Sequence, residues 1–155
     1  MTVKHIENKK RKPIVDALTG VLADTFVLYY KTHTNHWNVE GPHFRSLHLM
    51  FEEQYTDMWK ALDEIAERLR ALESYTPVSL KDLAARAELK EAGQLRDATQ
   101  MVKDLADDHE ALCDKMSKVI DLADDAEDQV TADLLTTRLG IHEKTAWMLR
   151  ALLEA

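Results

Sequence analysis

Apolar side chains recur along most of the chain at alternating spacings of three and four residues, which is the periodicity of an amphipathic α-helix. The pattern is strong in residues 44–73 and 94–122, present in residues 13–39 and weaker in residues 128–153. In residues 44–73, the second expected helix along the chain, the apolar stripe consists of Leu47, Phe51, Tyr55, Met58, Leu62, Ile65, Leu69 and Leu72. The pattern therefore predicts an all-α four-helix bundle.

Turn-forming residues separate the expected helices. Gly41-Pro42 ends the first helix, and the break at Ser74–Pro77 is followed by a short helical segment that ends near Ala85. The remaining connections fall before residue 94 and around the acidic stretch Asp124–Asp128. We expect one bundle domain over residues 13–155, preceded by a separate N-terminal segment.

The composition agrees with a helical domain. The 155 residues include only four Gly and three Pro, which disfavours a turn-rich all-β fold. Hydrophobic residues make up 45% of the chain and charged residues 31%, enough apolar surface to form a core. No apolar run approaches the ~18 residues of a membrane span, and the single Cys113 cannot form an internal disulfide. These features predict a cytoplasmic protein without a membrane segment.

The net charge of −8 is divided unevenly along the chain. In residues 1–12, five basic side chains stand against Glu7 and give +4, so the remaining residues carry −12. We expect a flexible basic arm that could contact DNA phosphates electrostatically or could serve solubility or assembly. Its basic residues are Lys4, Lys9, Lys10, Arg11 and Lys12.

A second face of the second helix carries His48, Glu52, Asp63 and Glu67. His48 with Glu52, and Asp63 with Glu67, are i, i+4 pairs, so each pair can converge on one metal ion. The outer members are about 28 Å apart along a straight helix, so one chain cannot bring both pairs to the same ion. An antiparallel copy of the helix would place each pair opposite the other, with Trp59 near the two-fold axis. An ordinary solvated face is the alternative, and the spacing alone leaves it open.

A long motif runs from the end of the first helix into the second. It consists of Asn35-His36-Trp37-Asn38-Val39-Glu40-Gly41-Pro42-His43-Phe44, then Ser46-Leu47-His48, then Leu62-Asp63-Glu64-Ile65-Ala66-Glu67-Arg68. This motif closely resembles that of the Dps family, the miniferritins named as DNA-binding proteins from starved cells. The order and lengths of the expected helices match this family across nearly the whole chain outside the N-terminal arm.

The resemblance implies a ferritin-like four-helix bundle with a short helix between the second and third long helices, assembled as a hollow homododecamer. It also implies ferroxidase centres at two-fold interfaces. Each centre would bind two iron ions and oxidise Fe(II) to Fe(III), usually with hydrogen peroxide. Iron would then be stored in the shell, and DNA would be protected from oxidative damage.

The resemblance also assigns roles to single residues. The implied iron ligands are His36, His48 and Glu52 from one subunit, with Asp63 and Glu67 from its two-fold partner. Glu52 stands where Asp is common in the family and adds a methylene to the reach of its carboxylate. Trp37 matches the family tryptophan beside the centre, where it would trap stray oxidising equivalents.

By the same resemblance, Asp124 and Asp133 correspond to acidic positions that line the pore through which iron enters at the three-fold axis. The intermediate acidic position falls on Gln129, with Asp128 beside it. The pore is therefore expected to keep a negative field.

Three other histidines are not expected to bind iron. His109 lies on the apolar stripe of the third helix and is expected to be a buried, hydrogen-bonded histidine. His33 lies one turn before His36 and is expected to be structural. His142 is expected at the surface or at an interface.

Two other functions compete with the miniferritin. An ordinary ferritin with its di-iron site inside each bundle needs a Glu-x-x-His motif on each of two helices. The only match is Glu40-Gly-Pro-His43, which Pro42 makes non-helical. A non-enzymatic nucleoid protein that binds DNA, with structural acids on its second helix, is the other alternative.

Overall fold

The computed structural model describes residues 2–154, and these form five α-helices and no strand. The helices are α1 (Asn8–Asn38), α2 (Phe44–Ala71), α3 (Leu80–Ala85), α4 (Ala98–Asp125) and α5 (Gln129–Ala151). The all-helical class is confirmed, and so is the short helix in the connection after α2. The ends of α2, α4 and α5 lie within four residues of the predicted ones.

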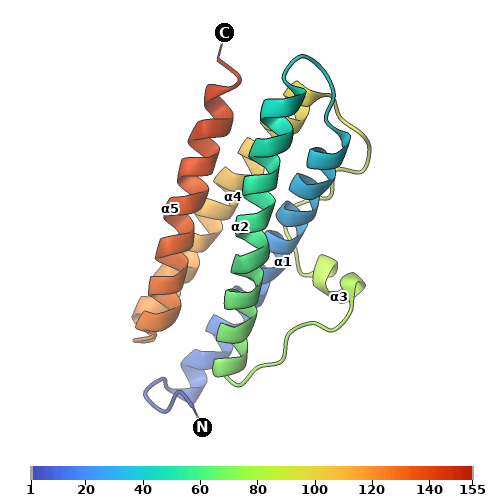
Figure 1. Ribbon diagram of the computed structural model, residues 1–155. Coiled ribbons are helices and arrows are strands. Elements are labelled where there is room, and N and C mark those ends of the chain that lie inside the picture. The colour runs from blue at the N-terminus through green and yellow to red at the C-terminus, as the bar shows by residue number, and fades with distance from the viewer. Residues whose placement is uncertain (1, 155) are drawn as a thin grey trace.

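The four long helices lie side by side and form the bundle (Figure 1). In this view α1 rises from the N-terminus and α2 descends beside it. The connection between α2 and α4 then crosses the length of the bundle, so α4 descends parallel to α2 and α5 rises to the C-terminus. α1 packs against both α2 and α4, and α5 packs mainly against α4. One long crossover therefore distinguishes this bundle from a simple up-and-down arrangement.

Local signals in the sequence start the later helices. Asp97 accepts a hydrogen bond from the backbone N–H of Gln100 at 2.9 Å, and Asp128 accepts one from Thr131 N–H at 3.0 Å. Each carboxylate satisfies a backbone donor that has no partner within its own helix. These caps place the starts of α4 and α5.

α1 begins five residues earlier than the pattern predicts, at Asn8 instead of Pro13. Proline has no N–H and usually marks the first turn of a helix. Here the backbone N–H groups of Lys10 and Arg11 both bond to the carbonyl oxygen of Glu7, at 2.9 and 3.1 Å. Residues 8–12 of the expected arm are consequently helical.

The segment before α1 is anchored to the bundle. Val3 and Ile6 are only 3% and 1% exposed. The backbone N–H of Thr2 donates to Glu73 at 3.0 Å, and the Arg11 guanidinium bonds to the same carboxylate at 2.9 Å. This finding differs from the expectation of a flexible arm, because two apolar side chains and a shared carboxylate hold the segment against the end of α2.

The connection between α2 and α4 is fastened to α1. The Asp24 carboxylate accepts the backbone N–H groups of Glu88 and Leu89 at 2.7 and 3.0 Å. Its other oxygen accepts from the Lys115 ammonium at 2.7 Å. Asp24 is almost fully buried. A buried charge is costly unless it is paired and hydrogen-bonded, and these three donors compensate that cost.

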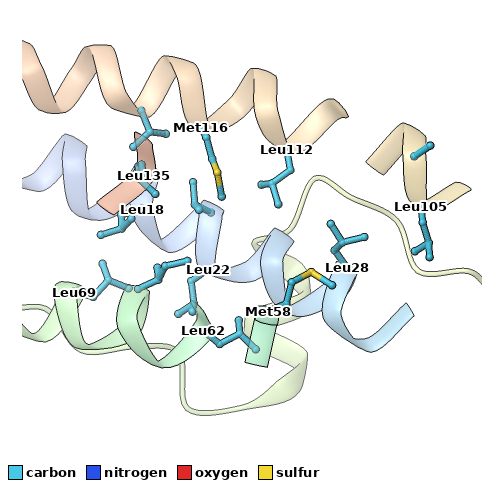
Figure 2. Close-up of a cluster of buried hydrophobic side chains, with 14 of the residues drawn as sticks. Leu18, Leu22, Leu28, Met58, Leu62, Leu69, Leu105, Leu112, Met116 and Leu135 are labelled. Atoms are coloured by element: carbon cyan, nitrogen blue, oxygen red, sulfur yellow. The ribbon is translucent and has the colours of Figure 1, made fainter. Parts of the chain in front are cut away.

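The core lies where the predicted apolar stripes meet (Figure 2). Its members include Leu18, Leu22 and Leu28 of α1, Met58, Leu62 and Leu69 of α2, Leu105, Leu112 and Met116 of α4, and Leu135 of α5. Burial of one such side chain contributes about 1.5–3 kcal/mol. Because this stripe of α2 points inward, the second face of the same helix points out of the bundle.

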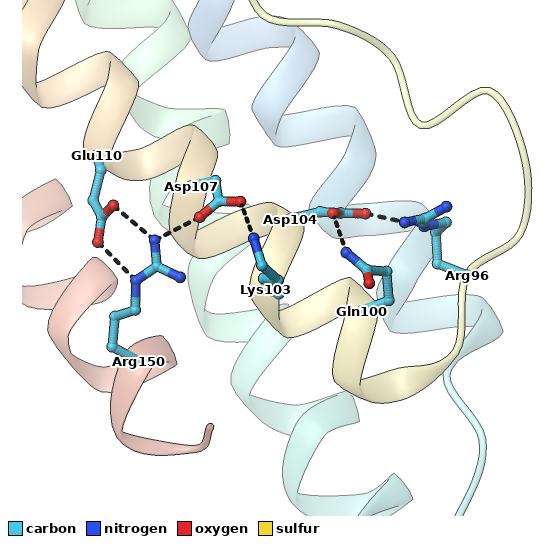
Figure 3. A network of polar contacts seen from close by, with 7 residues as sticks. All are labelled: Arg96, Gln100, Lys103, Asp104, Asp107, Glu110 and Arg150. Carbon is cyan, nitrogen blue, oxygen red and sulfur yellow. Dashed lines mark hydrogen bonds and ion pairs between the residues drawn. The ribbon is translucent and has the colours of Figure 1, made fainter. Parts of the chain in front are cut away.

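The end of α5 is tied to α4 by a network of charged side chains (Figure 3). Arg150 reaches from α5 to Asp107 and Glu110 of α4, at 2.5 and 2.7 Å. Other pairs continue the network along α4: Lys103 with Asp107, Gln100 with Asp104, and Arg96 with Asp104. Part of the acid-rich surface of α4 is therefore neutralised by basic partners.

α1 is long and apolar enough, by length and composition, to cross a membrane. However, 56% of its most apolar 18-residue stretch is buried inside the bundle. No other helix within residues 2–154 is as long and apolar. The burial of α1 is that of a core helix.

Candidate metal centre

His36 and His48 face each other where α1 turns into α2. Their rings stack with centroids 3.8 Å apart and 14° between the planes. His36 lies in the last turn of α1 and is 8% exposed, whereas His48 lies near the start of α2 and is half-buried. The turn between the helices includes Gly41 at φ +112°, a conformation that glycine adopts without strain. The chain thus folds back tightly enough to bring the two rings together.

Reciprocal hydrogen bonds fix which nitrogen of each ring carries the proton. Nδ1 of His36 donates to the carbonyl oxygen of His48 at 2.7 Å. Nδ1 of His48 donates to the carbonyl oxygen of His36 at 2.6 Å. A carbonyl oxygen only accepts, so both Nδ1 atoms must be protonated in the neutral rings. Each Nε2 atom therefore keeps the lone pair that a metal ion requires.

The expected carboxylate ligands divide between the two ends of α2. Glu52 is exposed one turn after His48, whereas Asp63 and Glu67 are exposed on the last turns of the helix. The first pair and the second pair are about 22 Å apart along the helix axis. Within residues 2–154, no three His, Cys, Asp or Glu side chains come together to hold an ion. One chain accordingly offers two partial sites, and their union across a two-fold axis stays a prediction.

Aromatic rings adjoin the histidine pair. The ring of Tyr55 meets that of His36 edge-on, with centroids 5.2 Å apart. Tyr55 also stacks on His33 at 3.8 Å, with 9° between the planes. Trp37, which is 59% exposed, lies 4.1 Å from His33 on the other side. The expected tryptophan beside the centre thus contacts His33.

The same cluster extends along α1 and α2. The Tyr29 hydroxyl and Nδ1 of His33 are hydrogen-bonded at 2.9 Å, and Trp59 lies 5.5 Å from the Tyr29 ring. Burial lowers the pKa of His33, and the nearby His36 lowers it further. Burial also raises the pKa of Tyr29, as do Tyr55 and Tyr30. The i, i+4 spacings 29–33–37 and 55–59 indicate shared helix faces, but the contacts between the two faces depend on the packing of α1 against α2.

The expected pore residues have different environments. Asp124, Gln129 and Asp133 are exposed around the turn between α4 and α5, where a pore between subunits could use them. Asp128 is 0% exposed and cannot line a pore in this conformation.

The structure gives Asp128 another role. Its carboxylate caps α5 by accepting from the N–H and hydroxyl of Thr131, at 3.0 and 2.5 Å. It also accepts from the Arg68 guanidinium of α2 at 2.6 Å. The charge of Asp128 is therefore used to join α2 to the start of α5.

A buried polar network crosses the bundle interior. Nδ1 of His109 and Nδ1 of His142 are 2.8 Å apart. Arg138 approaches Nε2 of His142 at 3.2 Å and binds Asp57 through two hydrogen bonds of 3.0 and 2.8 Å. The prediction for His109 is confirmed, but His142 is 0% exposed and its predicted surface position is wrong. Its neighbours in the network explain its burial.

The positive charge in this network belongs to Arg138 and is paired with Asp57. Arg138 is 3% exposed, and burial lowers the pKa of His109 to about 3. Burial also lowers the pKa of His142 well below its usual value. Bundles with an interior di-iron site direct carboxylates and histidines inward. Here the interior position between Asp57 and His142 is taken by Arg138, which has no lone pair to offer a metal ion, and this argues against the ordinary ferritin arrangement.

Most basic side chains of residues 1–12 are already engaged. The pairs are Lys9 with Glu7, Lys12 with Asp16, Arg11 with Glu73, and Lys10 with the carbonyl oxygen of Asp125. Lys4 is exposed. Exposed pairs are weak, so DNA phosphates could compete for the lysines, but the segment's position against the bundle shortens its reach.

The comparisons with known proteins agree with this fold. Residues 15–155 match the family described as the ferritin-like domain. An uncharacterized low temperature-induced protein of Nostoc is 41% identical over 151 residues, covering 96% of this chain and 84% of the relative. DNA protection during starvation protein 2 of Bacillus anthracis is 38% identical over 145 residues, covering 92% and 97%.

Solved structures give the same result. A Dps protein from Bacillus brevis superposes with a TM-score of 0.92 at 35% identity, covering 96% of this chain and 100% of that one. The Dps protein of Vibrio cholerae O1 also gives 0.92, at 31% identity over 96% and 94%. The latter is described as a member of a broad superfamily of ferritin-like diiron-carboxylate proteins.

The four-helix bundle with one long crossover defines a ferritin-like protein. Within that class, the chain belongs to the Dps family. The fold and family expected from the sequence motif are confirmed.

Proposed function

We propose that this protein oxidises Fe(II) at centres shared between two-fold related subunits and stores the Fe(III) product inside a dodecameric shell. The observation that carries the proposal is the His36–His48 pair, because both rings leave Nε2 available and residues 2–154 do not complete a three-ligand group around them. Relatives named for DNA protection during starvation support the biological role. Removal of iron and peroxide would protect DNA.

The proposed ligands suit iron as the substrate. Imidazole nitrogen and carboxylate oxygen bind Fe(II), and carboxylates also favour the harder Fe(III). His36, His48 and Glu52 would bind iron from one subunit, and Asp63 and Glu67 from the other. Two Fe(II) ions give one electron each to hydrogen peroxide, so two water molecules form and no hydroxyl radical is released.

A second copy of the chain fits the surface beside the acids. Trp59 is 60% exposed and borders a groove of about 640 Å³. The apolar residues Phe26, Leu62, Pro77 and Leu83 also line the groove, and so does Asp63. Exposed apolar surface of this kind is typical of an interface. An antiparallel partner would cover it and bring its histidine pair to the acids.

Mixing two inactive variants tests the shared centre. His48→Ala and Glu67→Ala each damage every centre of a homodimer, so each variant alone should be inactive. In a mixed dimer one centre contains both lesions, and the other has all five ligands. Random pairing makes half of the dimers mixed, so about a quarter of wild-type ferroxidase activity should return after joint unfolding and reassembly. The matched control mixes His48→Ala with Glu64→Ala, an exposed neighbour of the acids.

Failure of the mixture to recover activity, with assembly confirmed, would reject the inter-subunit centre, because ligands within one chain predict no recovery.

Light scattering tests the shell separately. Twelve 17.8 kDa subunits give about 214 kDa, and a stable monomer or a 24-mer would contradict the proposed assembly.

A further inference from the structure

The aromatic cluster joins the two partial iron sites of one chain. From His36 the ring contacts run to Tyr55 at 5.2 Å and from Tyr55 to Tyr29 at 6.3 Å. From Tyr29 the next contact is Trp59 at 5.5 Å. Trp59 lies one turn before Asp63 on the same face of α2. The cluster therefore begins at the histidine end of α2 and ends beside the acidic end.

We propose that Tyr55, Tyr29 and Trp59 carry single electrons between the two iron centres of a two-fold dimer. The inference rests on the proposed function, in which each chain supplies histidines to one centre and acids to the other. Every chain would then connect both centres internally. Tyrosine and tryptophan have the side chains that lose one electron most readily, and here they follow one another without an aliphatic interruption.

The chemistry of peroxide gives such a connection a purpose. Hydrogen peroxide needs two electrons, but Fe(II) gives one. A centre that holds a single Fe(II) would cleave the O–O bond with one electron and leave an oxidant equivalent to a hydroxyl radical. If the second electron arrives through the rings from Fe(II) in the other centre, the overall reaction is the same as in a centre that holds two Fe(II). Two Fe(II), one peroxide and two protons give two Fe(III) and two waters.

The Tyr29–His33 hydrogen bond accounts for the proton. The relay uses the His33 tautomer that carries its proton on Nε2. When Tyr29 loses an electron, its O–H bond breaks and the proton crosses the 2.9 Å hydrogen bond to Nδ1 of His33. When Fe(II) in the second centre reduces the tyrosyl radical, the proton returns to the Tyr29 oxygen. His33 also stacks on Tyr55 at 3.8 Å, so the proton acceptor lies beside both tyrosines of the relay.

Partial loading with iron isolates the relay from ordinary turnover. Apoprotein receives one Fe(II) per centre and then hydrogen peroxide at half the iron concentration, with a spin trap present. In the wild type nearly all iron should be oxidised, with little hydroxyl adduct. In Tyr29→Phe, which keeps the ring and removes the oxidisable phenol, the oxidised fraction should fall about twofold and the adduct should rise. Trp147→Phe is the control, because this exposed tryptophan lies on α5 outside the cluster.

A second readout is the radical itself. Samples frozen within milliseconds should show a transient tyrosine or tryptophan signal by electron paramagnetic resonance in the wild type, and loss of its tyrosine part in Tyr29→Phe. At two Fe(II) per centre both proteins should oxidise iron equally, which shows that the centre is intact. An unchanged oxidised fraction in Tyr29→Phe at one Fe(II) per centre would overturn the relay. Absence of peroxide-driven oxidation in the wild type at full loading would instead overturn the proposed function.

Discussion

Replacement of Asp128 by alanine should destabilise the subunit without affecting a pore. The change removes the cap of α5, which costs about 1 kcal/mol. It also leaves the Arg68 guanidinium, whose side chain is 10% exposed, without its charged partner, and hydrogen bonds to charged groups contribute about 1.5–3 kcal/mol. The free energy of unfolding should fall by about 3 kcal/mol, which for a chain of this length lowers Tm by roughly 6–12 °C.

Thermal unfolding followed by circular dichroism measures this effect. The assembled proteins are compared at one subunit concentration, because association contributes to the apparent stability. Asp128→Asn keeps an oxygen that can cap α5 but loses the charge that binds Arg68, so its Tm should lie between those of the wild type and Asp128→Ala. Asp125→Ala, at an exposed neighbour, should stay within about 0.5 kcal/mol of the wild type.

The reasoning would be refuted by an Asp128→Ala protein with unchanged Tm and slow iron uptake. That combination would mean that the carboxylate acts in a pore and that the contacts with Arg68 and Thr131 contribute nothing.

Three further predictions follow from other contacts. Asp124→Asn with Asp133→Asn should slow iron uptake several-fold at low salt, because the exposed carboxylates attract Fe(II), whereas equal uptake rates would exclude them from the pore. Ile6→Ala should lower the free energy of unfolding by about 2–4 kcal/mol in urea titrations, and a change as small as that of Lys4→Gln would show that the N-terminal segment is not anchored. Finally, stability should be lost as pH falls from about 6.5 toward 3, because unfolded His109 binds a proton that the folded residue, with its pKa lowered to about 3, does not. Urea midpoints at pH 7 and pH 5 should therefore differ less in His109→Gln than in the wild type, with exposed His5→Gln as control.

The sequence determined those features that depend on spacing within one helix. The 3.6-residue period of the α-helix fixes which side chains share a face, so the apolar stripe of α2 and the outward group from His48 to Glu67 could both be predicted. The turn at Gly41 and the long motif around His36 and Trp37 were likewise local. These elements gave the fold class, the family and the proposed ligands.

The tertiary structure decided what depends on partners far along the chain. His36 and His48 present Nε2 because each ring bonds to the other's backbone across a turn. Asp128 and His142 have ordinary sequence contexts, and their burial follows from Arg68 of α2 and from His109 of α4. The N-terminal segment is held by Glu73, more than sixty residues away. Periodicity shows where a side chain points along its own helix, but only the packing of helices against one another determines which charges and hydrogen bonds it meets.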